Sequence, residues 1–241
     1  MDLAAHGIEL VRADNPGPLT LSGTNTWIVG RWVVDPGPAL DAHLDAVAAA
    51  VGARGGTEGI ALTHDHADHV EGVDGLLARV GGDVPVVSAR GGAVDGDVAG
   101  PLRVLALPGH SDDHLAFVAG RAAFTGDAVL GEGSVFVASQ LAAYLQGLRA
   151  LRALDLDVLC PGHGPPVWNV TAKLDGYLEH RAERERLLVS ALERGLRTED
   201  ELLDAAWGDA PAELREFALL SLRAHLEKLR LEGRGTSTAA G

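Results

Sequence analysis

Residues 63–69 read Thr-His-Asp-His-Ala-Asp-His, and this stretch decides which fold and which chemistry the sequence predicts. It places four metal-binding side chains within six positions. Imidazole and carboxylate groups bind divalent ions such as zinc, manganese or iron(II). The spacing is not helical, because neighbours on a helix face lie three or four residues apart. The four predicted ligands are His64, His66, Asp68 and His69.

A short apolar run at residues 58–63 precedes these ligands and predicts a buried strand. The ligands then lie on the turn that leaves the strand, where a rigid backbone can point several side chains into one pocket. Four ligands on so short a segment would crowd one tetrahedral ion, but they suit two adjacent ions. His64 and His66 are expected on the first ion. Asp68 and His69 are expected on the second.

Three further polar residues come after short apolar runs, and a glycine directly precedes each of them. Glycine lets the backbone turn tightly and approach an ion closely. Packing alone does not explain a pattern that occurs three times. These residues are therefore predicted to complete the two metal sites, and they are His110, Asp127 and His163.

With these motifs in this order, and with Asp35 in Val-Val-Asp-Pro-Gly ahead of them, the chain resembles the metallo-β-lactamase superfamily. The resemblance covers roughly residues 8 to 170 and implies an αββα sandwich. The alternation of short strands and helices indicates only an α/β fold by itself. The resemblance assigns His64, His66 and His110 to the first ion, Asp68, His69 and His163 to the second, and Asp127 to both as a bridge.

Individual elements follow from the apolar runs and the turns rich in Gly, Pro and Asp. Strands are expected at residues 26–29, 31–34, 59–62, 84–87, 102–107, 115–118 and 121–124, and helices at 40–51, 70–79 and 140–154.

Hydrolysis is the chemistry that two such ions support. Two divalent ions about 3.5–4 Å apart lower the pKa of a shared water, so that a bridging hydroxide exists near neutral pH. The hydroxide would attack a carbonyl carbon or a phosphorus, and Asp68 would hold it and accept its proton. Asp68 and Asp127 are therefore the predicted catalytic residues. Zinc is the metal that these ligand types favour, although manganese or iron would give the same pattern.

Four neighbours of the ligands are weaker candidates. Thr63 and Asp65 could orient ligand imidazoles as hydrogen-bond partners. Ser111 and His114 could do the same near His110, and His114 could also donate a proton to a leaving group. A structural part in the turn or the core is the alternative for each, and it is the favoured interpretation of His114. Histidines without a motif are interpreted as surface or helix residues, and they are His6, His43, His180 and His225.

The sequence changes character after residue 172, where long, charged helices with spaced leucines begin. Thr198-Glu199-Asp200-Glu201 has the spacing of a capping box and opens the second of three expected helices. Pro211 opens the third. Three short helices followed by Glu-Gly-Arg-Gly at 232–235 resemble a winged-helix module with a short wing. We therefore expect a catalytic domain at residues 1–172 and a helical, winged-helix-like domain at 173–241.

Similar C-terminal modules occur in the lactamase-β-like proteins, a branch that includes endoribonucleases of single-stranded RNA. Pro-Gly-His-Ser-Asp-Asp-His at residues 108–114 also resembles that branch. Cleavage of single-stranded RNA is therefore the first functional hypothesis. The second is hydrolysis of a thioester or another small acyl ester, similar to the hydroxyacylglutathione hydrolases. A metal-binding module without enzymatic activity is the third, and the complete ligand set argues against it.

The surroundings of the metals discriminate between the first two hypotheses. Phosphate recognition needs Arg or Lys near the ions, whereas an acyl group needs an apolar channel. The formal net charge of −14 argues against a broad basic surface for nucleic acid. Few basic residues flank the motifs, which favours the acyl hypothesis, although two bound divalent ions would oppose the negative field locally.

The sequence gives weaker indications of the cellular location and the oligomeric state. No apolar stretch approaches the roughly 20 residues that cross a bilayer, so no membrane partner is expected. The first residues lack the features of a signal peptide, and the single cysteine, Cys160, fits a reducing compartment. A cytoplasmic protein is therefore expected. The C-terminal helices have a mixed charge balance, so a homodimer contact is an alternative to nucleic-acid binding.

Overall fold

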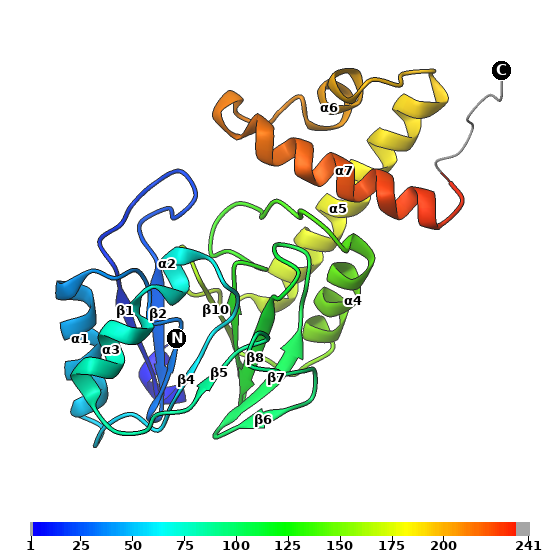
Figure 1. The fold of residues 1–241 in the computed structure, drawn as a ribbon. Coiled ribbons are helices and arrows are strands. Elements are labelled where there is room, and N and C mark those ends of the chain that lie inside the picture. The colour runs from blue at the N-terminus through cyan, green and yellow to red at the C-terminus, as the bar shows by residue number, and fades with distance from the viewer. Residues whose placement is uncertain (1, 235–241) are drawn as a thin grey trace.

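The computed structural model describes residues 2–234, and its main body is a sandwich of two five-stranded sheets. The sheets pack face to face, and helices cover both outer faces. Figure 1 shows α1 (Asp41–Gly52) and α3 (Gly72–Val80) outside one sheet and α4 (Leu141–Arg152) outside the other. This arrangement confirms the αββα fold that the sequence led us to expect.

The first sheet combines an antiparallel meander with two parallel strands. β1, β2 and β3 are neighbours in antiparallel pairing, whereas β3–β4 and β4–β5 are parallel pairs. Parallel strands need a long connection between them, which α1 provides between β3 and β4. The spatial order is β1-β2-β3-β4-β5, with β1 at Ile8–Arg12, β2 at Asn25–Val29, β3 at Trp32–Val34, β4 at Gly59–Ala61 and β5 at Val86–Val87.

The second sheet also combines an antiparallel meander with parallel pairing, here in the single pair β9–β10 at one edge of the sheet. β6 to β9 are antiparallel neighbours, and β10 lies parallel to β9 after the chain has crossed over through α4. The order is β10-β9-β8-β7-β6, with β6 at Val98–Ala99, β7 at Leu102–Ala106, β8 at Leu115–Ala119, β9 at Ala122–Gly126 and β10 at Val158–Pro161.

Aromatic side chains hold the inner faces of the sheets together. Trp27 of the first sheet packs edge-on against Phe124 of the second, with 6.3 Å between the ring centroids. The indole Nε1 of Trp27 also donates a hydrogen bond of 2.9 Å to the backbone oxygen of Pro161 at the end of β10. This bond satisfies the polar atom of an otherwise buried ring. It also fixes the end of β10 relative to the first sheet, next to the turn that carries His163.

The helix expected after the histidine motif consists of two short helices. α2 (Ala67–Val70) begins within the motif, and α3 starts at Gly72 after a break at Glu71. The break coincides with a tertiary contact, because the backbone N–H of Gly72 bonds to the oxygen of Gly37 at 2.9 Å. A Cβ atom at position 72 would lie only 2.8 Å from that oxygen, so the close passage requires glycine.

The C-terminal helices share one long element with the sandwich. α5 (Val170–Glu193) packs its first half, including Leu174 and Tyr177, on the outer face of the second sheet. Leu188 and other residues of its second half form a separate core with the last helices. The domain boundary at residues 172 and 173 stays a prediction, and α5 crosses that position without a break. The remaining helices are α6 (Glu199–Trp207), the 3₁₀ turn η2 (Ala212–Leu214) and α7 (Arg215–Leu231).

Both predicted helix starts in this region correspond to elements of the structure. The capping box is present, since Thr198 accepts from the backbone of Glu201 and the Glu201 side chain accepts in return. Pro211 precedes η2, and α7 follows directly after that turn. The expected wing at 232–235 extends beyond the described residues. Within residues 2–234 no helix combines the length and the apolar character that crossing a membrane requires.

Replacing Leu222 by Ala is expected to destabilise the protein by about 2–5 kcal/mol. The side chain is fully buried in the C-terminal core, and truncation would leave a cavity there. Leu220→Ala is the matched control, because this neighbour on α7 is 39% exposed. It should cost less than about 1 kcal/mol. Urea denaturation measures both free energies of unfolding, and equal losses would contradict the assigned core.

Candidate metal centre

The structure brings all seven predicted ligands together at one end of the sandwich. His64, His66, Asp68 and His69 follow β4, and the others follow β7, β9 and β10. Each segment leaves the carboxyl end of its strand, where turns from neighbouring strands meet. In Figure 1 this is the end at which α2 lies, facing the C-terminal helices.

The ligand atoms form two groups, each within 4.8 Å. The first consists of His64, His66, His110 and Asp127, and the second of Asp68, His69 and His163. Asp127 also contacts the second group, since its Oδ1 lies 3.6 Å from His69 Nε2 and its Oδ2 lies 3.2 Å from His163 Nε2. The structure thus brings the seven residues together in the two groups that were predicted, with Asp127 beside both, and their assignment to two ions stays a prediction.

Unpartnered polar atoms in the cluster show that it suits metal ions. His64 Nε2, His69 Nε2, His110 Nδ1 and Asp127 Oδ1 are buried and have no hydrogen-bond partner among the described residues. Such orphaned atoms are costly in a folded protein unless something satisfies them. Imidazole nitrogen and carboxylate oxygen together are the donor set of zinc and related divalent ions. The two groups therefore fit two such ions, and the residues' roles as ligands remain our proposal.

Charge in the second group is arranged as ion pairs. Burial raises the pKa of Asp68, but its hydrogen bond with His163 and the charge of His69 outweigh burial and bring the pKa to about 2. Burial lowers the pKa of His163, but its hydrogen bonds with Asp127 and Asp68 raise it to about 9. His69 behaves in the same way, because Asp127 and Asp35 outweigh its burial and raise its pKa. Protons thus occupy the positions where a cation would bind.

Two histidines of the first group, His64 and His110, are held neutral instead. Burial and the neighbouring histidines His69 and His114 hold the pKa of His64 well below its ordinary value. Burial also lowers the pKa of His110. Neutral imidazoles offer a lone pair to a metal without first losing a proton.

Asp35 supports both groups through hydrogen bonds to Thr63, which adjoins His64, and to His69. Its Oδ1 accepts a 2.8 Å bond from the backbone N–H of Thr63, and its Oδ2 accepts from the Thr63 hydroxyl at 2.7 Å. The same Oδ2 lies 2.9 Å from His69 Nδ1, so that the Nε2 of His69 faces the cluster. The Thr63 hydroxyl lies 3.0 Å from His64 Nδ1, which leaves the Nε2 of His64 for a ligand.

A second support comes from the loop before β2, and sequence reasoning gave it no role. The Thr24 hydroxyl donates a 2.8 Å bond to Asp68 Oδ2. Asn15 clamps Thr24 in turn, because its Nδ2 donates to the Thr24 hydroxyl at 2.9 Å and its Oδ1 accepts from the Thr24 N–H at 2.8 Å. Asp68 is thus oriented by a residue 44 positions earlier in the chain.

The four weaker candidates have different surroundings. Thr63 bonds to Asp35 and lies beside His64, as described above. His114 Nε2 accepts a 3.2 Å bond from the backbone N–H of Asp127, and its ring stacks on His64. The Asp65 side chain pairs with Arg90, and Ser111 donates to Asp113. Thr63 and His114 are thus placed to orient ligands, whereas the bonds of Asp65 and Ser111 lead elsewhere.

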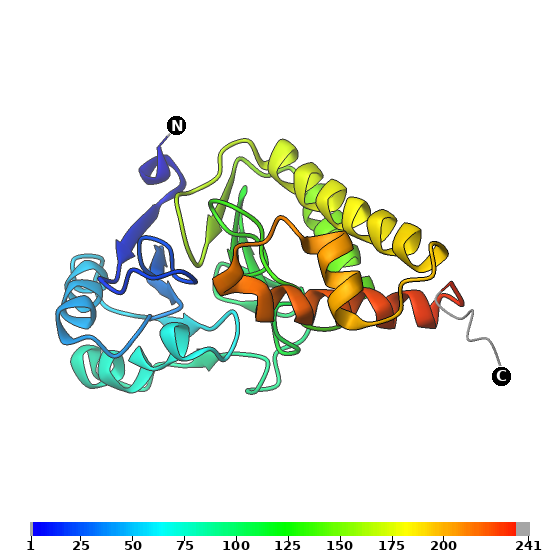
Figure 2. The ribbon, with the colours of Figure 1, turned by 90° about the horizontal axis from the view of Figure 1, so that it is seen from above.

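A cavity of about 780 Å³ lies over both groups, and we call it the site cavity. Its floor includes five predicted ligands, and its walls come from the loop at residues 18–21, the segment after β9 and the C-terminal helices. Figure 2 shows that loop pointing toward the chain around η2 and the start of α7. The walls are mainly apolar, and the large apolar side chains that the C-terminal helices and their connections contribute are Trp207, Pro211, Leu214, Phe217 and Leu220.

Comparison with known proteins places this geometry in a family. A family model described as the metallo-beta-lactamase superfamily matches residues 78–163. The chain is 32% identical to the beta-lactamase-like protein 2 homolog of Caenorhabditis elegans, over 91% of this chain and 82% of that protein. The chain belongs to the metallo-beta-lactamase superfamily. A second model, the beta-lactamase-associated winged helix domain, matches residues 198–240, so the C-terminal helices form a winged-helix module.

Two further proteins are similar to the chain over most of their length. The chain is 30% identical to an atrochrysone carboxyl ACP thioesterase of Aspergillus fumigatus, over 90% of this chain and 78% of that protein. A solved metallo-beta-lactamase family protein from Thermus thermophilus has a TM-score of 0.68 and 25% identity, with 94% of each chain covered. At these coverages the likeness extends over the sandwich and the module together.

Zinc binding to the metal-free protein is expected to release protons at neutral pH. His69 and His163 have raised pKa values and must lose their protons before they can bind a metal. The affinity should therefore rise with pH and level off only above the His163 pKa of about 9. Calorimetric titration in buffers of different ionisation enthalpy counts both ions and protons. An observed enthalpy that does not depend on the buffer would contradict the proposal.

Replacing Thr24 by Val is expected to weaken metal binding at the second group by about 10–100-fold. Valine keeps the shape of threonine but cannot donate to Asp68, whose carboxylate would lose a fixed orientation. Thr24→Ser retains the hydroxyl and should bind nearly as the wild type does. Competition with a chromogenic chelator measures the affinities. An equal loss in both variants would show that packing, and not the hydrogen bond, is what Thr24 supplies.

Proposed function

We propose that this superfamily member is a dinuclear metal-dependent hydrolase of acyl thioesters. The observation that carries the proposal is the mainly apolar site cavity, which opens directly onto both ligand groups. Apolar walls with a few polar groups at one end suit a hydrocarbon chain whose reactive carbonyl reaches the floor. The thioesterase name of the Aspergillus relative supports the same substrate class.

The chain's own residues fit this reaction. His64, His66 and His110 would hold one ion, Asp68, His69 and His163 the other, with Asp127 between them. When bound, two divalent ions supply a water of lowered pKa and polarise the oxygen of a carbonyl group. Asp68 is ionised, because its pKa lies at about 2, and Thr24 fixes one of its oxygens. Its carboxylate is thus unprotonated and oriented, and the proposal assigns it as the proton acceptor for the attacking water.

The proposed leaving group also fits the surroundings. A thiol has a pKa of about 8.5, so a thiolate departs without a strong proton donor. His114, the residue that sequence analysis considered as a donor, is buried beneath Asp127 and does not line the site cavity. An alcohol or an amine would need such a donor more than a thiolate does.

Cleavage of single-stranded RNA ranked first on sequence resemblance and becomes the second candidate here. An RNA backbone is bound through several accessible cations. Only two arginines, Arg181 and Arg184, line the site cavity within the described residues, and Arg184 pairs with Asp209 at 2.7 Å. The net charge of −14 adds no general attraction for a polyanion.

Three further expectations belong with the proposal. Zinc is the metal that we propose, with manganese or iron as alternatives that the same donor atoms accept. A homodimer and a cytoplasmic location stay predictions.

The test compares both substrate classes on one preparation. Zinc-loaded protein is expected to cleave neutral acyl thioesters of N-acetylcysteamine and to leave end-labelled single-stranded RNA intact. Thiol release should stop with a chelator and fall by about 10²–10⁴-fold in Asp68→Ala, which lacks the proton acceptor.

Asp83→Ala is the control variant, because this carboxylate is exposed in the segment between α3 and β5. It should retain full activity. Metal-dependent RNA cleavage that Asp68→Ala abolishes, with every thioester inert, would overturn the acyl proposal in favour of the nuclease.

A further inference from the structure

One wall of the site cavity contains a buried arginine without a counter-ion. Arg181 lies on α5, is 3% exposed, and forms no ion pair with any described carboxylate. Its Nη2 donates to the Ser134 hydroxyl at 3.1 Å, but Nε and Nη1 have no hydrogen-bond partner among residues 2–234. A guanidinium carries five N–H donors, so this environment leaves most of them unsatisfied.

The neighbours of Arg181 add donors instead of acceptors. His180 Nε2 accepts a 3.0 Å bond from Arg184 Nε, while His180 Nδ1 is in close contact with Arg181 Nη2. A neutral imidazole has only one acceptor nitrogen, so His180 cannot accept from both arginines. The pKa of His180 is lowered to about 4 by its burial and by both arginines, so a second proton is not available to it at neutral pH.

The nearest carboxylate does not correct the imbalance. Asp209 makes a two-pronged contact with Arg184, with both N–O distances at 2.7 Å. Arg184 Nη1 also donates to the backbone oxygen of Ala206. Arg184 is therefore neutralised and well bonded, and the charge of Arg181 remains. A buried charge without a partner is costly, which indicates that an anion belongs beside Arg181.

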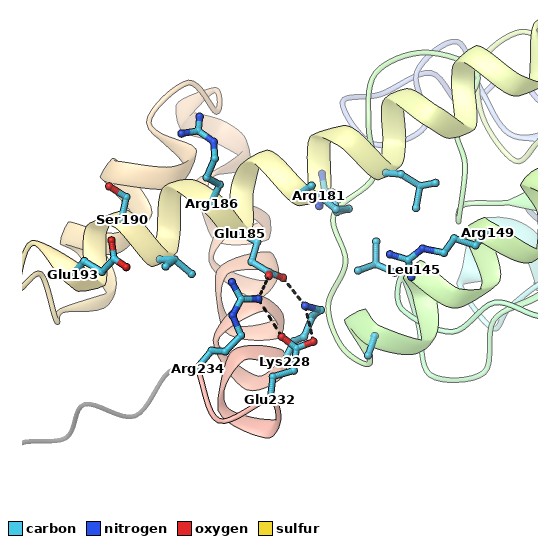
Figure 3. A pocket seen from close by; sticks show the side chains of 14 residues that line it. Leu145, Arg149, Arg181, Glu185, Arg186, Ser190, Glu193, Lys228, Glu232 and Arg234 are labelled. Carbon is cyan, nitrogen blue, oxygen red and sulfur yellow. Dashed lines mark hydrogen bonds and ion pairs between the residues drawn. The ribbon is translucent and has the colours of Figure 1, made fainter.

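Arg181 also borders a second cavity of about 530 Å³ between α4, α5 and α7, which Figure 3 shows. The cations at its far side are already paired there. Lys228 contacts Glu185 at 2.6 Å, and Arg234 contacts the same carboxylate. Glu193 and Glu232 line this cavity as well, together with Arg149 and Arg186. Of the two cavities, the site cavity is the one that also reaches the predicted metal ligands, so an anionic group of the same substrate would meet Arg181 from that side.

We propose that Arg181 is a specificity determinant that binds an anionic oxygen group of the substrate, remote from the scissile bond. The inference rests on the proposed thioesterase function. One continuous cavity touches the metal ligands and Arg181, with apolar walls for the intervening chain. Ser134 lies in the segment 127–140, which contains no helix or strand, so its hydroxyl can give way to a ligand oxygen. The group is a carboxylate on the acyl half or a phosphate on the thiol half.

Four kinds of thioester distinguish these sources. Hexanoyl and adipoyl thioesters of N-acetylcysteamine differ only in the carboxylate at the far end of the acyl chain. The corresponding phosphopantetheine thioesters extend the thiol side by a pantoyl-containing chain that ends in a phosphate. We expect kcat/KM to be at least about tenfold higher for one anionic series than for the neutral hexanoyl compound, the size of a charge-assisted bond. Equal values for all four would overturn the proposal.

Variants then assign the preference to a residue. Arg181→Met should reduce the ratio of anionic to neutral kcat/KM toward one, whatever its absolute activity, and Arg181→Lys should restore part of the ratio. Arg149→Met is the matched control, since this exposed cation borders only the second cavity. It should preserve the wild-type ratio. A ratio that survives in Arg181→Met, or that is lost in Arg149→Met, would contradict the proposed contact.

Binding to the wild-type protein separates failure of the inference from failure of the proposed function. If no thioester is cleaved, the thioesterase proposal fails, and calorimetric titration with hexanamide and the monoamide of adipic acid, which differ only in the far carboxylate, decides about Arg181. Tighter binding of the adipic acid monoamide that Arg181→Lys retains would support the anion subsite. Equal binding of the two amides would overturn it, and this result does not require any substituted protein to fold.

Discussion

The carboxylate of Asp35 ties the backbone of the sandwich to the side chains of the metal centre. It lies at the end of β3, in the left-handed backbone region with φ of 52°, and is almost fully buried. Three donors from the neighbouring turn converge on its two oxygens, two from Thr63 and one from His69. Left-handed backbone is unfavourable for a residue other than glycine, so these bonds must offset its cost. Both ligand groups inherit their orientation from this contact, because Thr63 adjoins His64.

The long helix α5 fixes the position of the C-terminal helices relative to the sandwich. Its first half belongs to the sandwich core through Leu174 and Tyr177, and its second half belongs to the module core through Leu188. Between them, His180, Arg181 and Arg184 face the site cavity. A continuous helix transmits the position of one core to the other over its whole length. The apolar wall that the C-terminal helices form is therefore held in a fixed position relative to the predicted metal ligands. Within the described residues, no flexible linker separates the two parts of the cavity.

How much of this could be predicted depends on the range of each interaction. The candidate ligands were predictable from local signals. Four of them lie in one dense motif at residues 64–69, and His110, Asp127 and His163 each follow a glycine at the end of an apolar run. The break between α2 and α3 was not predictable, because it coincides with a contact between Gly72 and Gly37 across the fold. Thr24 and Asn15 were missed for the same reason. His180 and His225 were expected on helices or the surface, and the structure has both on helices, with His225 fully buried. No periodicity in the sequence indicated that Arg181 would lack a counter-ion.

The floor of the site cavity and the apolar wall from the C-terminal helices come from separate parts of the sequence. The predicted metal ligands lie between residues 64 and 163, whereas five of the large apolar side chains that line the cavity, including Trp207 and Phe217, lie between 207 and 220. Substitutions in the later stretch can change the shape of the cavity, and thus the range of proposed substrates, without touching the predicted metal ligands. Descendants of one ancestral gene can thus diversify in what they cleave while keeping how they cleave it. The module is then the part of the protein in which new substrate ranges would be selected.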